Sequence, residues 1–189
     1  VLALLGLLGP FGAPARAKTT WQGVLPNSMP SQSNAIFKIA AVDGVHAWTV
    51  GKRNTGGNDE IVGLRTTNGT TWEPMSMPQG ASLFPVIPTA LVFADANQGY
   101  LAGSQMEGVS FVNKIFVTTN GGGSWTEQTT VDGAPLQFQR LRTGEIFGVG
   151  DGYVVRTLDG QTWTSHPVAG PSAEVVPAGI SMLNETCGF

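Results

Sequence analysis

The sequence contains a single cysteine, Cys187, so no disulfide framework can be read from it. A buried free thiol, or half of a disulfide whose other half lies outside this sequence, explains one cysteine more simply than a catalytic nucleophile does. The only histidines are His46 and His166, and neither has a cysteine or a second histidine at the spacing of metal ligands. We therefore predict no metal site, no cofactor and no catalytic residue in this chain.

Charge is also scarce, and none of it is concentrated in a basic segment. Only 12% of the residues are charged, and 10 lysines and arginines face 13 acids, for a net charge of −3. Such a chain lacks the basic footprint that a nucleic-acid backbone requires, so we predict no nucleic-acid partner. Long segments with apolar residues at helical spacing are missing as well, which argues against an α-helical fold.

The longest apolar run lies at the start, from Val1 to Leu8. It stops well short of the ~18 residues that a membrane-spanning helix needs. The following Ala15-Arg16-Ala17 has the small-x-small form of a signal-peptidase site. We predict that residues 1–17 are the remnant of a signal peptide cleaved near Ala17, and that the mature chain, 18–189, is secreted or periplasmic without a transmembrane segment.

What the sequence has in abundance is glycine, 26 residues, between short runs of alternating apolar and polar residues. This pattern predicts an all-β protein. A turn motif recurs three times, in the segments Thr66-Thr67-Asn68-Gly69-Thr70-Thr71-Trp72, Thr118-Thr119-Asn120-Gly121-Gly122-Gly123-Ser124-Trp125 and Thr157-Leu158-Asp159-Gly160-Gln161-Thr162-Trp163. The tryptophans that end the three copies are residues 72, 125 and 163. Internal repeats at this spacing are typical of β-propeller blades of ~40–50 residues.

The flanks of the motif repeat too. Before each turn come an apolar strand, a strand that ends in glycine (Gly51, Gly103 and Gly150) and a third apolar strand, and a fourth strand follows the tryptophan. Each unit therefore predicts four antiparallel strands, which is one propeller blade. We count three full blades, with a partial first blade at Lys18–Gln22 and a partial last one from Gly179.

These turns resemble the Asp-box, or BNR, repeat, approximately S-x-D-x-G-x-T-W. Among Asp-box propellers, the alternation of strands and turns looks most like the photosystem II assembly and stability factor group, whose members resemble binding scaffolds. The physical role expected of the motif is local, because a short Asx side chain accepts backbone N–H bonds and glycine supplies a positive φ. The predicted structural turn residues are Thr66, Asn68, Gly69, Thr71, Trp72, Thr118, Asn120, Gly122, Ser124, Trp125, Thr157, Asp159, Gly160, Thr162 and Trp163.

Antiparallel geometry places the Asp-box turns at one end of each blade and longer loops, such as residues 52–59 and 105–113, at the other. Loops on a rigid scaffold are where binding residues concentrate. The side chains best suited to anchor a partner there are those of Lys52, Arg53, Met106 and Phe111. The predicted function is a non-enzymatic scaffold that binds a protein client.

Two alternatives come from other classes. One is a sialidase-like glycoside hydrolase, since Asp boxes also occur in those enzymes, with catalytic residues mostly outside this sequence. The Arg-Ile-Pro segment of sialidases is absent, and Arg65 and Arg156 lie just before turns, at the wrong end of their strands. The other alternative is a cell-surface adhesion module, in which the propeller is one domain of a larger protein.

Overall fold

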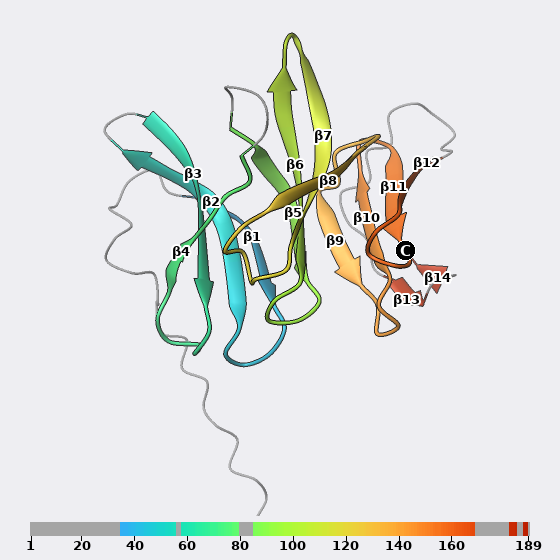
Figure 1. Cartoon of the computed structure of the whole chain (residues 1–189). Coiled ribbons are helices and arrows are strands. Elements are labelled where there is room, and N and C mark those ends of the chain that lie inside the picture. The colour runs from blue at the N-terminus through green and yellow to red at the C-terminus, as the bar shows by residue number, and fades with distance from the viewer. Residues whose placement is uncertain (1–34, 56–57, 80–84, 169–181, 185–186, 189) are drawn as a thin grey trace, which may run out of the picture.

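The computed structural model describes residues 35–55, 58–79, 85–168, 182–184 and 187–188, which form antiparallel β-sheets (Figure 1). Three sheets have four strands each, in the order in which the strands follow one another along the chain. Sheet 1 contains β1 (Ala35–Ala41), β2 (Ala47–Thr55), β3 (Asn58–Thr66) and β4 (Glu73–Met75). Sheet 2 contains β5 (Ile87–Phe93), β6 (Gly99–Glu107), β7 (Ser110–Thr118) and β8 (Thr126–Val131). Sheet 3 contains β9 (Gln137–Arg140), β10 (Ile146–Gly150), β11 (Tyr153–Thr157) and β12 (Trp163–Pro167), and a two-stranded hairpin follows, β13 (Met182–Asn184) with β14 (Cys187–Gly188).

Within each four-stranded sheet, the turns that join the first strand to the second and the third to the fourth lie together. The Gly69 N–H donates to the Val45 carbonyl at 2.9 Å, and the Gly121 N–H donates to the Asn97 carbonyl at 2.7 Å. We call this the turn end. The hairpins between second and third strands point the opposite way, to what we call the hairpin end (Figure 1).

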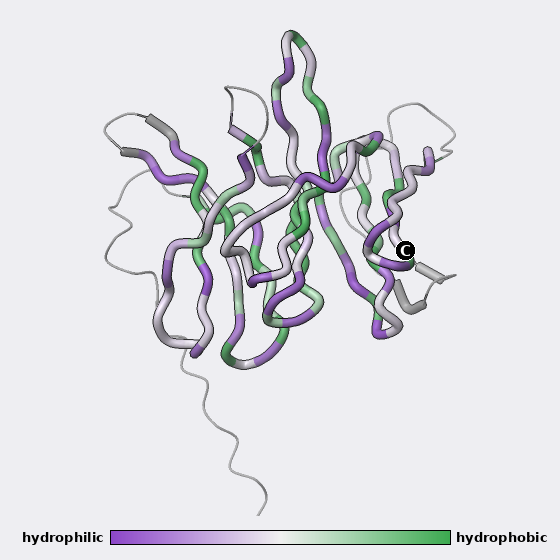
Figure 2. The backbone as a smooth tube through the Cα atoms, in the orientation of Figure 1, coloured by the Kyte–Doolittle hydropathy of each residue, from purple (hydrophilic) through white to green (hydrophobic). Residues whose placement is uncertain are grey.

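The core lies between the sheets because each strand alternates its side chains between two faces. Sheets 1 and 2 bury one apolar cluster, made of Trp48, Val50, Met75, Val86, Leu91, Phe93, Leu101 and Phe116. Sheets 2 and 3 bury a second, made of Ala90, Tyr100, Ala102, Ile115, Phe138 and Ile146. In Figure 2 apolar and polar residues accordingly alternate along the strands. The sheets thus pack face to face as layers. The first strands of the three sheets, β1, β5 and β9, are neighbours.

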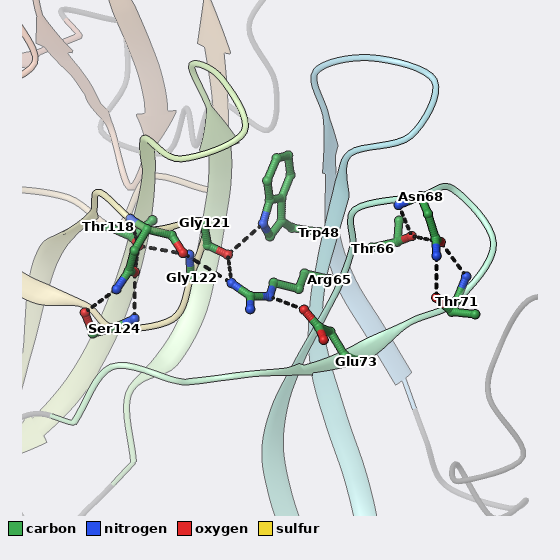
Figure 3. Close-up of polar contacts among 11 residues, drawn as sticks. Trp48, Arg65, Thr66, Asn68, Thr71, Glu73, Thr118, Gly121, Gly122 and Ser124 are labelled. Carbon is green, nitrogen blue, oxygen red and sulfur yellow. Dashed lines mark hydrogen bonds and ion pairs between the residues drawn. The ribbon is translucent and has the colours of Figure 1, made fainter.

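Backbone carbonyls of one sheet's turn accept hydrogen bonds from side chains of the preceding sheet. The Trp48 indole Nε1 donates to the Gly121 carbonyl at 3.0 Å, and Arg65 Nη1 donates to the same carbonyl at 3.1 Å (Figure 3). At the next interface, Gln128 Nε2 donates to the Gly160 carbonyl at 2.9 Å. The two turn carbonyls at these boundaries are therefore hydrogen-bonded, which apolar packing alone would not achieve.

The prediction of an all-β fold of four-stranded antiparallel blades, of the β-propeller type, is confirmed for three units. The prediction of loops over 52–59 and 105–113 is wrong. The β2–β3 ladder continues to the pair Thr55–Asn58, and the β6–β7 ladder continues to Glu107–Ser110. Residues 105–113 are strand except for two, because a turn of two residues closes the hairpin. The predicted signal remnant at 1–17 and the partial blade at Lys18–Gln22 lie outside the described residues.

Candidate functional site

The most prominent feature of the hairpin end is the β6–β7 hairpin, which extends beyond the other strands (Figure 1). Its turn consists of Gly108, with φ 62°, and Val109, whose φ is negative. Glycine in the first central position with positive φ is the signature of a type II′ turn, whose twist matches that of the flanking strands. The two strands, of nine residues each, can therefore pair along their whole length.

Apolar side chains lie exposed at the tip of this hairpin. Val109 is 100% exposed and Phe111 is 58% exposed. Met106 lies opposite Phe111 in the ladder and is half-buried. Figure 2 marks the apolar residues in this outer part of the hairpin. Two large apolar groups are thus presented to solvent on a backbone that the ladder holds in place.

A buried ammonium group braces the hairpin from its other side. Lys114, which is 3% exposed, contacts Glu107 on β6 at 2.5 Å and Glu127 on β8 at 2.9 Å. Desolvation lowers the pKa of Lys114, but the hydrogen bonds to the two glutamates outweigh it and hold that pKa above its usual value. Lys114 is therefore charged and joins three strands.

A groove of about 600 Å³ lies beside the hairpin, between β7 and β12. Its walls come from β7, from β8 and the two residues that follow it, and from β12. The β10–β11 hairpin has strands of five residues and closes at Asp151 and Gly152, whose φ values of 47° and 77° are those of a tight type I′ turn. The β6–β7 hairpin, with strands of nine residues, is longer. The groove is lined by Phe111, Val112, Asn113, Thr130, Val131, Asp132, Gly133, Trp163 and Ser165.

The four residues predicted to form a partner face lie on two different hairpins. Met106 and Phe111 meet on β6–β7, whereas Lys52 and Arg53 lie on β2. Arg53 is engaged, since its Nη2 donates to Glu60 Oε2 at 2.6 Å. The structure thus brings together one pair and not all four. Val109 was not predicted, although the Glu-Gly-Val-Ser sequence between two strand-forming runs is a turn signal that could have revealed it.

The predicted turn residues lie at the turn end, and in each of the three turns an Asx side-chain oxygen and a threonine hydroxyl accept backbone N–H bonds. Figure 3 shows the first two turns. The Asn68 side-chain oxygen accepts from the Thr70 and Thr71 N–H groups at 2.9 and 2.8 Å. The Asn120 oxygen accepts from the Ser124 N–H at 2.9 Å, and Thr118 Oγ1 accepts from the Gly122 N–H at 2.9 Å. These contacts are internal to the turn.

The third turn has the acid in the Asx position. Asp159 Oδ1 accepts from the Gln161 and Thr162 N–H groups at 2.8 and 2.7 Å, and Thr157 Oγ1 accepts from the Gly160 N–H at 2.9 Å.

Of the three tryptophans that follow the turns, Trp125 Nε1 donates to the Ser76 carbonyl of sheet 1 at 2.8 Å. Trp163 Nε1 donates to Gln128 Oε1 of sheet 2 at 2.9 Å, and Trp72 is half-buried on sheet 1.

We predict that the Asp159 turn makes the protein's stability depend on acidity. Hydrogen bonds from the Thr162 and then the Gln161 N–H lower the pKa of Asp159 from 3.8 to about 2. Because the folded pKa is the lower one, the stabilisation is present above the unfolded pKa and is lost as pH falls through the folded pKa. Urea unfolding measured for the protein and for Asp159→Asn should show that the advantage of the acid shrinks between its ordinary pKa and about pH 2. Asp43, also lowered to about 2, titrates in both proteins and cancels, so a pH-independent difference would contradict the prediction.

Among the described residues, no group of three or more His, Cys, Asp or Glu side chains is placed to hold a metal ion. In the same part of the chain, no helix is long and apolar enough to cross a membrane. The two histidines lie apart, with His46 Nδ1 against Asp43 Oδ2 at 2.8 Å in a turn and His166 exposed on β12.

No protein-family model matches the chain, and no curated protein matches it. A similar solved structure comes from the GH130 family of mannoside phosphorylases, described as containing glycoside hydrolases that target β-1,2 mannosidic linkages in Candida mannan. The two share 10% identity with a TM-score of 0.40, over 71% of this chain and 49% of that one. The chain therefore spans about half the length of that protein. The Asp-box and photosystem II factor resemblance stays a prediction from the sequence.

The prediction that this protein is not an enzyme is corrected, because that solved structure belongs to a family of glycoside-acting enzymes. At this identity and TM-score the likeness carries no argument about substrate, mechanism or site.

Proposed function

We propose that this β-propeller binds a protein partner at its hairpin end, with Val109 and Phe111 of the β6–β7 hairpin as the central contacts. The observation that supports the proposal is the exposure of these two side chains, 100% and 58%, at the tip of the hairpin that projects furthest. Isolated exposed apolar residues are ordinary on protein surfaces. These two differ because Val109 lies in the turn and Phe111 lies two residues after it, so that they share one hairpin tip, and because aromatic residues are enriched in the centres of protein interfaces.

The rigidity of the hairpin favours binding. A partner that docks on a mobile loop must compensate for the entropy lost when the loop becomes ordered. The β6–β7 hairpin is ordered already, by the ladder that runs to Glu107–Ser110 and by the contacts of Lys114 with Glu107 and Glu127. Contact area at its tip therefore contributes to affinity with a small ordering cost.

Site-specific photocrosslinking tests the proposal. A photoreactive amino acid is placed at Val109, and in a matched variant at Leu158, which is 60% exposed but lies at the turn end. Each full-length variant is incubated with envelope extract, in line with the proposed secreted or periplasmic location. We expect a discrete crosslinked protein from position 109 that excess unlabelled protein suppresses, and none from position 158. Equal labelling from both positions would contradict the proposal.

The partner is then purified and its affinity measured. Phe111→Ser should weaken binding by about tenfold or more, because interface aromatics often contribute at least the ~1.4 kcal/mol that corresponds to this factor. Leu158→Ser serves as the control, and unchanged affinity of Phe111→Ser would overturn the assignment of the contact. A fluorogenic glycoside assay on the same preparation examines the alternative of a glycoside hydrolase, for which turnover is the positive result.

A further inference from the structure

The groove beside the β6–β7 hairpin has an unusual charge distribution. Of the nine residues that line it, Asp132 alone carries a charge, and it is exposed. Most of the others carry uncharged hydrogen-bonding groups, notably Asn113, Thr130 and Ser165, or aromatic rings, Phe111 and Trp163. The groove is therefore polar and anionic, and it is not an extension of the core.

We infer that this groove takes a lysine or arginine side chain of a protein partner. The inference rests on the proposed function and deepens it, because Phe111 belongs both to the exposed tip and to the wall of the groove. A partner that contacts the tip can insert a side chain into the groove next to it. That side chain is basic because the only charge in the groove is the Asp132 carboxylate.

The position of Asp132 is fixed by the fold. Its backbone N–H donates to Ser165 Oγ at 3.1 Å, which ties the loop after β8 to strand β12 of the next sheet. Within the described residues, no hydrogen bond or ion pair joins the Asp132 carboxylate to another side chain. A carboxylate held at the mouth of a groove without a cationic neighbour attracts a cation from outside.

The nearest basic residue on the hairpin does not neutralise this acid. Lys114 projects from the opposite face of β7, toward sheet 1, where it is paired with Glu107 and Glu127. Arg156 lies on the far face of sheet 3, because its partners in the ladder are Phe147 and Thr164 and not the groove-lining Ser165. None of the groove-lining residues is basic.

The remaining walls suit the two parts of a long basic side chain. The ring of Phe111 can pack against an aliphatic stem, or against a guanidinium plane through a cation–π contact. The Asn113 side-chain oxygen already accepts from Ser104 Oγ at 2.6 Å, which fixes its orientation and leaves it a second lone pair. Together with the hydroxyl group of Ser165, it offers acceptors for the donors of arginine.

The test is an NMR titration of the isotope-labelled full chain with N-acetyl-arginine amide, and in parallel with N-acetyl-citrulline amide, which has the same shape without the charge. We expect arginine to shift the Trp163 indole N–H and the Gly133 amide signals in a saturable way. Citrulline should bind at least about tenfold more weakly, because the charge on Asp132 favours only the cation. Equal shifts from the two compounds, or none from arginine, would overturn the inference.

Two variants locate the effect. Asp132→Asn should weaken arginine binding by about tenfold while the backbone bond to Ser165 stays in place. Phe111→Leu, which keeps an apolar group but removes the ring face, should weaken it by roughly threefold or more. Glu60→Gln is the control, since it removes the same charge on the other long hairpin and should leave arginine binding unchanged.

The outcome is separable from that of the proposed function. If the Val109 crosslink to a partner is found but arginine and citrulline behave alike, the hairpin tip binds a protein and the groove does not select a basic side chain. If arginine binds in the Asp132-dependent manner but no crosslink forms, the groove assignment stands and the tip contact fails.

Discussion

Replacing Trp48 by alanine is expected to lower the free energy of unfolding by about 3–5 kcal/mol, the largest loss of any single substitution in sheets 1 and 2. The side chain is 1% exposed and its ring stacks on Phe93 of sheet 2, with centroids 3.7 Å apart and planes 4° apart. Its Nε1 also donates to the Gly121 carbonyl. The substitution therefore removes apolar burial, a ring contact and a hydrogen bond at one boundary.

Urea unfolding followed by circular dichroism measures this loss. Trp48→Phe separates the contributions, because phenylalanine keeps a ring against Phe93 but has no donor for Gly121. It should cost about 1 kcal/mol, the usual net contribution of one hydrogen bond, because the Gly121 carbonyl still accepts from Arg65. If Trp48→Ala cost less than about 1 kcal/mol, the assigned packing of sheet 1 on sheet 2 would be wrong.

Gly150→Ala is expected to be the second most damaging substitution, with a loss of about 3 kcal/mol, at the upper end of what one added methyl group costs in a packed core. A Cβ at Gly150 would overlap the Ala134 carbonyl oxygen and lie 2.7 Å from its carbon and 3.0 Å from the Leu136 nitrogen. Those atoms are backbone, so no side-chain rotation relieves the overlap. The Leu136 N–H donates to the Val149 carbonyl at 2.7 Å, and this bond must lengthen if the segment moves.

A matched substitution distinguishes this clash from a general effect of losing glycine. A Cβ at Gly44 has nothing within 4 Å, and its φ is not positive. Gly44→Ala should therefore change the free energy of unfolding by less than about 0.5 kcal/mol, or raise it slightly by restricting the unfolded chain. Thermal unfolding of both variants by calorimetry gives the comparison, and equal losses would refute the role assigned to the Ala134 contact.

The parts of the fold that the sequence predicts are those set by local chemistry. The turns around Asn68, Asn120 and Asp159 could be found because an Asx side chain followed by glycine encodes its own hydrogen bonds. Once the turns were placed, strand order followed, since a chain that reverses at each turn gives four neighbouring antiparallel strands. Sequence reasoning therefore predicted the three units and the end at which each turn lies.

The candidate site was predicted only in part, because it depends on differences between neighbours. Phe111 was identified, but the groove beside it is formed by residues of β7, β8 and β12, which two different sheets contribute. Strand length here depends on where the turns at Gly108 and Asp151 close the ladders. The burial of Lys114 was equally hidden, since its two glutamates come from the strands on either side and not from its own segment.

The different donors at the two sheet boundaries bear on how the chain avoids misassembly. Proteins built from repeated units are prone to pairing a unit with the wrong neighbour, in the same chain or in another copy. Trp48 and Arg65 of sheet 1 donate to the turn of sheet 2, which is one residue longer than the other two turns. Gln128 of sheet 2 donates to the turn of sheet 3, which has the shorter form. Docking sheet 3 directly on sheet 1 would leave the Arg65 guanidinium facing a turn of the wrong length. The donors of sheet 1 therefore disfavour the incorrect unit, and the repeats can share a fold without being interchangeable during folding.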